Sequence, residues 1–491
     1  MARPPFLRFL PLLAALAMAA CSPRPDKGPV VVSAIGSAPG YVDLNHRSAD
    51  MPDRMLIDAT AQGLVRFDAA GQVEPGLAER WIVIDDGRTY IFRLREAAWA
   101  NGDPVTASDV ALILRRAIGP DSRNPLKPFL TAIDEIKPMT ERVVEVSLTR
   151  PRPDLLKLFA QPDLAILRAN PPGGSGPFRI VRDGDPVGRL LRPVADLDRS
   201  PDDDIAAPAP EQDVRLIGEG ASRAIVRFVG KQSDYVAGGT LADWPLVTRA
   251  GTAPNNIKLD ATAGLFGLAI VDRQGFLIDP AGRGAIAAAI DRTALIAAIA
   301  PDWGQPVERL LPDKLDAAAA PAAPAWANGT ADARLAAARQ QVATYRAQHP
   351  EPIVLRISLP TGPGATLLYG QLAARLILIG IVPQRVGMSD AADLRLVDAV
   401  APYDSARWYL ATACQPCSEQ ATAALEAARD APDMAQRATH ITEADRLLAD
   451  DVAFIPIATP FRWSLVSLRL KQWQGNARGW HPLNHLRNDT N

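Results

Sequence analysis

Apolar and polar residues alternate with a period of two in several short runs, which is the pattern of half-buried β-strands. Two of these runs, 81–85 and 89–94, flank an acidic turn at 85–87, so we expect a β-hairpin there. Runs rich in β-branched residues at 30–33 and 143–148 predict further strands.

Runs with a helical period separate these strands. Thr106 is followed three residues later by Asp109, a spacing that predicts a capping box at the start of a helix ending near Gly119. The helical period of 285–299 is interrupted by Asp291, which predicts the N-cap of a second helix. A helical stretch is also expected around 56–62.

The order of elements in the second half predicts the fold class. A strand at 353–359, a helix at 366–379 that Gly380 ends, and a strand at 381–386 form a β-α-β crossover unit. The Ala/Pro-rich stretch 318–327 is expected to be a loop. Together these patterns predict an α/β protein.

Composition narrows the classes of function. The chain has 491 residues, 48% of them apolar, which is enough for two or three folded domains. The 53 basic and 55 acidic residues give a net charge of −2, so no excess of positive charge predicts nucleic-acid binding. The 3 cysteines are too few for a zinc framework.

The N-terminus has the pattern of a signal peptide over residues 1–20. Arg3 and Arg8 precede an apolar run at 9–20, which is too short to span a bilayer and ends directly before Cys21. Small residues before a cysteine resemble a bacterial lipobox, which implies that Cys21 is lipidated. An ordinary secretory signal with a chance cysteine is the alternative.

If Cys21 is lipidated, residues 21–29 form a short tether to a membrane. Ser22 follows the cysteine, which in the lipoprotein resemblance favours the outer membrane if the cell is Gram-negative. No later apolar run reaches the length of a membrane span.

Three further features bear on possible metal or catalytic sites. His481 and His485 have a spacing that suits a metal on a helix, but exposed histidines of a C-terminal tail are the favoured reading. The acidic stretch 183–213 lacks the spacing of a calcium loop and predicts a solvated loop. Because the chain lacks Gly-x-Ser-x-Gly and His-Glu-x-x-His and has 5 histidines, we do not expect a hydrolase.

Several short blocks, taken together and in order, resemble bacterial extracellular solute-binding protein family 5, the dipeptide and oligopeptide binding components of ABC importers. The blocks are mostly turns and helix caps, so their order along the chain carries the resemblance. They are Gly63–Asp68, Pro75–Ala78 with Trp81, Asp85–Phe92, Asn101–Val110, Gly174–Phe178, Ala285–Arg292, Leu376–Ile381 and Phe454–Ile457.

The resemblance implies a two-lobe, periplasmic-binding-protein-like (type II) α/β fold with an inserted extra subdomain. Lobe I would combine residues 30–55, 172–250 and 461–491, the inserted subdomain would be 56–171, and lobe II would be 251–460.

The function that the resemblance implies is that of a lipid-anchored, periplasmic binding protein. It would capture a peptide or similar small solute by hinge closure and deliver it to an ABC permease, as a monomer and with no cofactor or metal. A degenerate family member that acts as a lipoprotein scaffold or receptor is the alternative, because Arg192–Asp198 lacks the aromatic residues usual in the family.

The resemblance also implies a set of ligand-binding residues. Asp404 matches the aspartate that pairs with the ligand amine in dipeptide binders, although a turn aspartate is the alternative. Arg407 would pair with a ligand carboxylate or with Asp404 itself. Tyr403 and Trp408 would form apolar walls unless they belong to the core. Trp99 and the turn at Ser175 would lie near the cleft.

The remaining two cysteines follow this segment. In dipeptide binders two cysteines at the corresponding place form a disulfide, so the resemblance implies a bond between Cys414 and Cys417. A redox-active pair, reduced thiols and a metal-bound pair are the alternatives.

Overall fold

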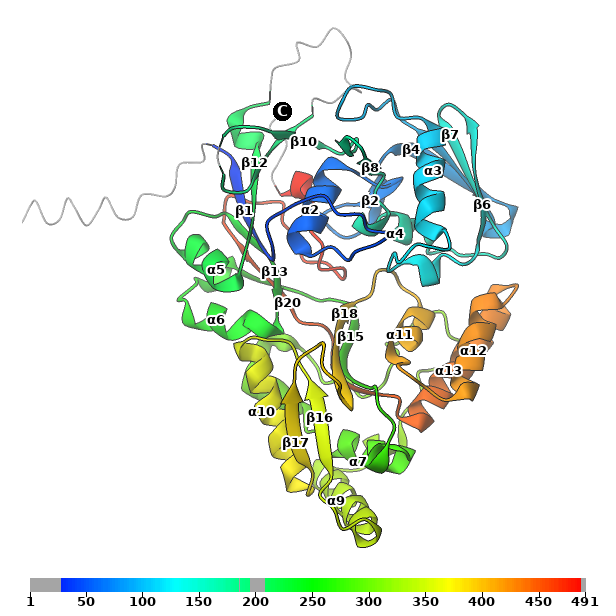
Figure 1. Cartoon of the computed structure of the whole chain (residues 1–491), viewed down its shortest axis with the longest axis vertical. Helices are drawn as coiled ribbons and strands as arrows, with labels where there is room; N and C mark the ends of the chain where they lie inside the picture. Colours follow the sequence, from blue (N-terminus) through cyan, green and yellow to red (C-terminus); the bar gives the residue numbers. More distant parts are fainter. Residues whose placement is uncertain (1–27, 185, 195–207, 487–491) are drawn as a thin grey trace, which may run out of the picture.

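The chain folds into two lobes joined by two crossing segments (Figure 1). The computed structural model describes residues 28–184, 186–194 and 208–486. The predicted signal peptide, Cys21 and the acidic run 202–204 lie outside the described residues. Within those ranges, no helix combines the length and apolar character needed to cross a bilayer.

Lobe I is built on a seven-stranded mixed sheet whose strand order is β10-β11-β12-β1-β13-β20-β14. The central β1 pairs in parallel with β12 and β13, whereas β20 runs antiparallel to both β13 and β14. The strands are β1 (Val30–Ile35), β10 (Phe178–Val181), β11 (Arg189–Pro193), β12 (Val214–Glu219), β13 (Tyr235–Thr240), β14 (Ile257–Asp260) and β20 (Arg462–Val466).

The inserted subdomain carries a four-stranded antiparallel sheet of order β4-β5-β7-β6, packed against helix α3. The predicted hairpin is confirmed, because Ile84 pairs with Thr89 at its turn. The capping box is also confirmed, with Thr106 and Asp109 bonded reciprocally. The elements are β4 (Ala78–Ile84), β5 (Thr89–Leu94), α3 (Ala107–Ile118), β6 (Ile133–Thr140) and β7 (Val143–Leu148).

Lobe II contains a five-stranded sheet of order β17-β16-β18-β15-β19. The predicted crossover is confirmed, since β16 and β17 pair in parallel and α10 connects them. Asp291 accepts a hydrogen bond from the Ala294 amide and caps α8, as expected. The elements are β15 (Gly264–Ile270), α7 (Pro280–Ala289), α8 (Arg292–Ile299), α9 (Ala331–Gln348), β16 (Val354–Ser358), α10 (Pro363–Leu378), β17 (Val382–Val386), β18 (Leu394–Val400) and β19 (Phe454–Ala458).

Helices surround these sheets. α11, α12 and α13 of lobe II lie directly below the inserted subdomain in Figure 1. The remaining helices and short strands are α2 (Met51–Thr60), β2 (Val65–Phe67), β3 (Val73–Pro75), α4 (Leu155–Phe159), β8 (Arg168–Ala169), β9 (Pro172–Gly173), α5 (Ala221–Val229), α6 (Trp244–Arg249), α11 (Ala406–Ala413), α12 (Glu419–Asp430) and α13 (Met434–Asp451).

The two crossing segments are residues 261–263, between β14 and β15, and residues 459–461, between β19 and β20. The sequence placed the first lobe boundary at 250/251. In the structure β14 pairs with β20, so the sheet of lobe I continues to residue 260. Thr262 donates a hydrogen bond to the Pro460 carbonyl, which joins the two segments side by side.

An apolar core continues from one lobe to the other beside these segments. Trp244 of lobe I packs edge-to-face on Phe461, which in turn packs on Trp303, and Trp303 packs on Phe266 of lobe II. Gly364 at the start of α10 allows close approach, because a Cβ there would lie 1.8 Å from the Leu241 carbonyl oxygen. We call this region, with the crossing segments, the hinge side.

Candidate functional site

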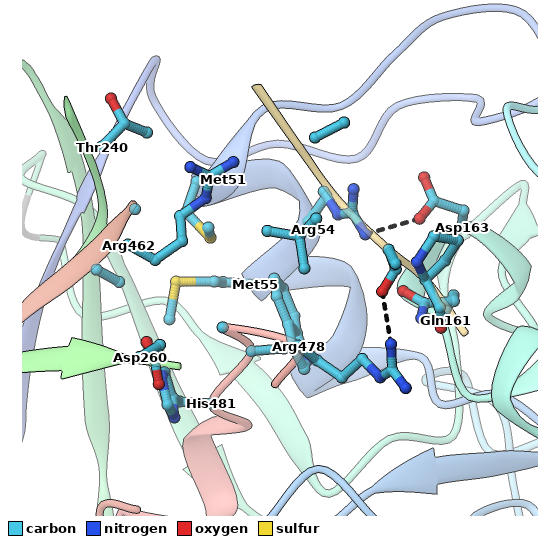
Figure 2. A pocket seen from close by; sticks show the side chains of 18 of the residues that line it. Met51, Arg54, Met55, Gln161, Asp163, Thr240, Asp260, Arg462, Arg478 and His481 are labelled. Carbon is cyan, nitrogen blue, oxygen red and sulfur yellow. Dashed lines mark hydrogen bonds and ion pairs between the residues drawn. The ribbon is translucent and has the colours of Figure 1, made fainter. Parts of the chain in front are cut away.

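A cavity of about 520 Å³ lies between the lobes, a volume within the usual range for small-molecule sites. Its walls come from α2, from β13 and β20, from the C-terminal segment 478–481 and from residues 398–402 of lobe II (Figure 2). The turn around Gln161 and Asp163 of the inserted subdomain closes another side.

Helix α2 presents one face to the cavity. Asp50 caps the helix by accepting a hydrogen bond from the Asp53 amide. Met51, Arg54 and Met55 then fall on one side because residues three and four apart are neighbours on a helix. A helix starting only at residue 56, as the sequence predicts, would lack this face; the Asp50-x-x-Asp53 cap was the available signal for the earlier start.

The strands β13 and β20 form the wall next to this helix. Gly239 pairs with Trp463 in the antiparallel register, and a Cβ at Gly239 would lie 2.1 Å from the indole ring. Glycine therefore lets the Trp463 ring pack directly against β13. The indole Nε1 donates to the Thr240 carbonyl at 2.8 Å, which fixes the ring in the cavity wall.

The C-terminal segment is folded back onto the cavity by Asp260. One oxygen of this buried carboxylate accepts the Asn476 amide at 2.9 Å, and the other lies 3.1 Å from Nε2 of His481. His481 is buried, and His485 bonds to Glu74, so the expectation of exposed tail histidines is wrong. Long-range contacts to lobe I order this segment, and its own sequence does not reveal them.

Two more ion pairs line the cavity. Asp163 and Arg54 are joined at 2.8 Å, as Figure 2 shows. Asp398 of β18 and Arg462 of β20 are joined at 2.7 Å, and this second pair connects lobe II to lobe I beside the hinge side.

Opposite the hinge side, residues 150–161 of the inserted subdomain contact residues 402–430 of lobe II; we call these contacts the rim. Gln161 donates to the Pro402 carbonyl at 2.6 Å, and Arg152 donates to the Arg429 carbonyl at 2.6 Å. Arg150 pairs with Asp430 at 3.1 Å. The two lobes therefore touch on both sides of the cavity.

Asp404 belongs to the rim and is not among the residues that line the cavity, although its partner Arg478 is, so a role of Asp404 in binding stays a prediction. Its Oδ2 accepts a hydrogen bond from Lys157 of α4, and its Oδ1 accepts one from Arg478. Burial acts to raise the pKa of the Asp404 carboxyl, but these two hydrogen bonds outweigh burial and hold the pKa below its ordinary value. The carboxylate is therefore ionised and joins the inserted subdomain, lobe II and the C-terminal segment.

The other residues expected at the ligand occupy different places. Trp408 lines the cavity. Tyr403 and Arg407 instead line a smaller neighbouring hollow beneath the rim. Arg407 lies over the Phe129 ring, 5.9 Å from its centroid, and burial lowers the pKa of its guanidinium to about 10. The partner of Asp404 is not Arg407, because Lys157 and Arg478 take both of its oxygens.

Trp99 and Ser175 are buried in lobe I and its insert, and they are not among the residues that line the cavity. The Trp99 ring lies 5.0 Å from the guanidinium of Arg168, and the Ser175 carbonyl accepts a hydrogen bond from Gln62 at 2.8 Å. The first contact lies within the inserted subdomain, and the second holds that subdomain against lobe I. A role of either residue in binding stays a prediction.

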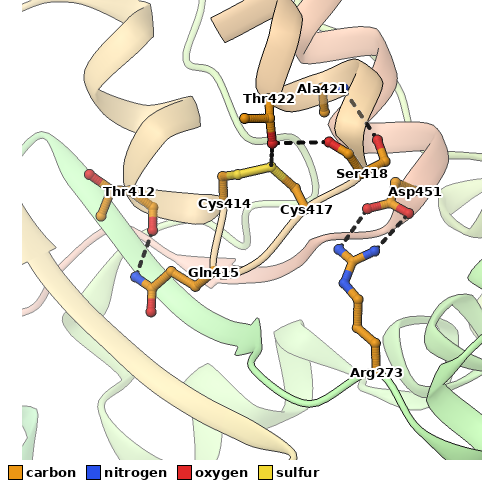
Figure 3. Close-up of a disulfide and its surroundings, with 9 residues drawn as sticks. All are labelled: Arg273, Thr412, Cys414, Gln415, Cys417, Ser418, Ala421, Thr422 and Asp451. Atoms are coloured by element: carbon orange, nitrogen blue, oxygen red, sulfur yellow. Dashed lines mark hydrogen bonds and ion pairs between the residues drawn. A yellow bond between two sulfur atoms is a disulfide. The ribbon is translucent and has the colours of Figure 1, made fainter. Parts of the chain in front are cut away.

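Cys414 and Cys417 are bonded to each other in the loop between α11 and α12 (Figure 3). Ser418 directly after the bond caps α12 by accepting the Ala421 amide. The disulfide thus fixes the short connection between α11, which carries Trp408, and the next helix.

Most residues of the cavity wall were not predicted from the sequence. Arg478 and Trp480 carried no prediction, although two tryptophans within 473–480 are an unusual density for exposed chain. Trp480 donates from Nε1 to Asp58 at 3.3 Å, and burial raises the pKa of that carboxyl to about 6. Asp398 lies in an apolar strand, which was a signal for a partnered charge.

Comparisons with known proteins agree with this architecture. The structure of Haemophilus influenzae OppA in complex with RPPGFSPFR covers 94% of this chain and 99% of its own, with a TM-score of 0.76 and 17% identity. The structure of the Escherichia coli murein tripeptide binding protein MppA covers 94% of this chain and 98% of its own, with a TM-score of 0.78 and 16% identity. These likenesses show the two-lobe fold.

Sequence relatives match over shorter stretches. The probable deoxycholate-binding periplasmic protein YgiS of Escherichia coli is 32% identical over 146 residues, which are 26% of this chain and 27% of that protein. The periplasmic oligopeptide-binding protein OppA of Haemophilus influenzae is 37% identical over 87 residues, 18% of this chain and 16% of that protein. The chain thus matches about a quarter or less of the length of these curated relatives.

A family description, bacterial extracellular solute-binding proteins, family 5 Middle, matches residues 72–351. This match covers more than half of the chain and includes most of the inserted subdomain, a part of lobe I and the first part of lobe II. The chain belongs to the bacterial extracellular solute-binding proteins of family 5.

Proposed function

We propose that this protein captures a peptide or a similar small solute in the cavity between its lobes and delivers it to an ABC permease. The observation that carries the proposal is the cavity of about 520 Å³ with walls from both lobes, which two short crossing segments connect. A solute that contacts both walls binds the closed form better than an open one and shifts the equilibrium toward closure.

The contacts available to a solute fit this mechanism. Apolar side chains from lobe I and from lobe II face each other across the cavity, so closure removes apolar surface of both lobes and of the solute from water. They are Met51, Met55, Tyr235, Trp463 and Trp480 on one side, and Pro402 and Trp408 on the other.

The experiment is native mass spectrometry of protein purified without denaturation, followed by calorimetry against dipeptides and tripeptides. A tightly bound, co-purified peptide or solute supports capture. An empty cavity and no heat with any solute would contradict capture and favour the alternative function, a lipoprotein scaffold.

The proposal includes an attachment to the periplasmic face of a membrane through Cys21. The basic start, the apolar run and the small residues before the cysteine support it. We expect Cys21→Ser protein to appear in the soluble periplasmic fraction and to lose label from radioactive palmitate. Retention of the variant in the membrane fraction would contradict the lipid anchor.

A further inference from the structure

The hollow beneath the rim has an excess of positive charge. Its volume is about 20 Å³, and its walls come from the inserted subdomain on one side and from lobe II on the other. The described residues that line it include more cations than anions. The cations are Arg152, Arg407, Arg429 and Arg437, and the anions are Asp154 and Asp316.

Ion pairs within the chain neutralise only a part of this charge. Each carboxylate in the hollow or next to it already lies opposite a cation other than Arg152 and Arg407. These pairs are Arg437 with Asp316 at 3.1 Å, Arg429 with Asp430 at 2.7 Å, and Lys157 with Asp154 at 3.8 Å.

Arg152 and Arg407 have no such counter-charge. Neither guanidinium forms an ion pair with a carboxylate of the residues that the structure describes. Arg152 donates to two backbone carbonyls at 2.6 Å each. Arg407 is 3.4 Å from each of two others, which is longer than an ordinary hydrogen bond. Carbonyl groups are neutral, so both guanidiniums keep their full positive charge.

These two arginines come from opposite sides of the hollow. Arg152 belongs to the inserted subdomain and lies between two prolines, which restrict its backbone, and Arg407 is in the first turn of α11 of lobe II. Burial lowers the pKa of the Arg152 guanidinium to about 9, and the charges of Arg437, Arg150 and Arg407 lower it further. Contact between the lobes therefore brings like charges together.

We propose that the hollow binds one small monovalent anion, of which chloride is the common example, between the guanidiniums of Arg152 and Arg407. A space of about 20 Å³ suits a single ion of this kind, because one water already needs roughly 10–15 Å³. A water molecule would also fit, but it has no net charge to offset two guanidiniums. The bound anion joins the inserted subdomain to lobe II. The proposal does not depend on which solute the larger cavity takes.

The test is a series of thermal melts in which sodium chloride replaces sodium gluconate at constant ionic strength. Gluconate is an anion too large for the hollow, so the series separates occupancy of the site from general screening. In the wild-type protein we expect the Tm to rise by at least about 1 °C and to level off as the site fills. In Arg152→Met and in Arg407→Met this rise should be lost.

Two control variants isolate the site. Arg446 lies on α13 of lobe II, is half exposed, and pairs with Glu443 and Asp450. Arg446→Met therefore removes a guanidinium away from the hollow and should keep the whole response to chloride. Arg407→Lys retains a cation at the site and should keep a part of it.

The position of the ion is measured by anomalous diffraction from crystals of the closed form in sodium bromide. We expect a bromide peak between Arg152 and Arg407. No rise of the wild-type Tm, a rise that persists unchanged in both methionine variants, or bromide at the protein surface only would each overturn the proposal. Circular dichroism in gluconate shows whether the variants fold, and where one does not, the wild-type bromide map decides by itself.

Discussion

The lobes meet in two places that differ in chemistry. On the hinge side, four aromatic rings pack in a row from Trp244 to Phe266, and two backbone segments cross. At the rim, the contacts are ion pairs and hydrogen bonds between side chains and carbonyls, such as Gln161 to Pro402. Apolar packing without water resists separation, whereas charged contacts exchange for water at small net cost.

This difference assigns the two regions different tasks. The hinge side belongs to the folded core and should contribute mainly to the free energy of unfolding. The rim can open without unfolding either lobe, so it should contribute mainly to the equilibrium between open and closed forms. Substitutions at the two places should therefore change different measurements.

The largest expected effect is on the hinge side. Phe461 is 3% exposed and contacts both Trp244 and Trp303, so Phe461→Ala leaves a cavity between the lobes. We expect the free energy of unfolding to fall by about 3–5 kcal/mol in urea denaturation. Leu468→Ala is the matched control, because Leu468 is exposed and follows β20, the strand that Phe461 precedes; it should change the free energy of unfolding little. A loss below about 1 kcal/mol in Phe461→Ala would remove the distinction between the two regions.

Asp404→Asn is expected to have the next largest effect, and on binding. The variant loses the charge that holds Lys157 and Arg478 together across the rim. We expect solute affinity measured by calorimetry to weaken about tenfold, while the urea midpoint changes much less than in Phe461→Ala. Unchanged affinity in a folded variant would mean that this junction does not contribute to closure.

The rim should also respond to pH through Asp154. Burial raises the pKa of its carboxyl to about 6. The smaller effects oppose one another: the positive charges of Lys157 and Arg437 lower this pKa, whereas the negative charges of Asp316 and Asp404 raise it. An open form exposes Asp154 to water and returns its pKa toward the ordinary range, so the closed form binds this proton more tightly. The contribution of Asp154 to closure is therefore fully present below the ordinary pKa of a carboxyl, partly lost at pH 5, and lost as the pH rises through about 6.

The measurement is solute affinity at pH 5 and pH 7 in wild type and Asp154→Asn. From pH 7 to pH 5 the affinity of the wild-type protein should increase by a few-fold more than that of Asp154→Asn, because the variant has no carboxyl at this position to take up the proton. If the ratio of the wild-type and Asp154→Asn affinities is the same at pH 5 and pH 7, closure does not bury Asp154.

The smallest effect is expected at the outer end of the rim. Asp430 is half exposed and pairs with Arg150 at 3.1 Å. We expect Asp430→Ala to change the free energy of unfolding and the free energy of binding each by less than about 1 kcal/mol, and less still in high salt. A larger loss in either free energy that persists in high salt would show that this end of the rim stabilises the contact between the lobes as strongly as the hinge side does.

Local patterns predicted the elements well and the site poorly. The capping box at Thr106, the hairpin turn at 85–87 and the N-cap at Asp291 depend on neighbours in sequence, and the structure has all three. The family resemblance is confirmed, and with it the expectation of a binding protein without catalytic activity.

The pairing of charges could not be predicted in the same way. Lys157 and Asp404 are separated by 247 residues, and Asp260 and His481 by 221. Each side chain alone is an ordinary surface residue type, and its partner is fixed by how the lobes and the C-terminal segment pack. Asp404 was predicted to pair with a ligand amine, which stays a prediction, and the two cations that bond it lie in segments with no local signal.

The adjacency of the two crossing segments has a mechanical consequence. They lie side by side, joined by the hydrogen bond from Thr262, so they act as a single hinge. Such a hinge allows the lobes to rotate relative to each other more easily than to move apart. Rotation about it displaces atoms in proportion to their distance from it. The ion pairs at the far edge therefore move furthest for a given rotation. Because a direct hydrogen bond requires donor and acceptor within about 3.2 Å, a displacement of a few ångströms at the rim replaces these contacts with water.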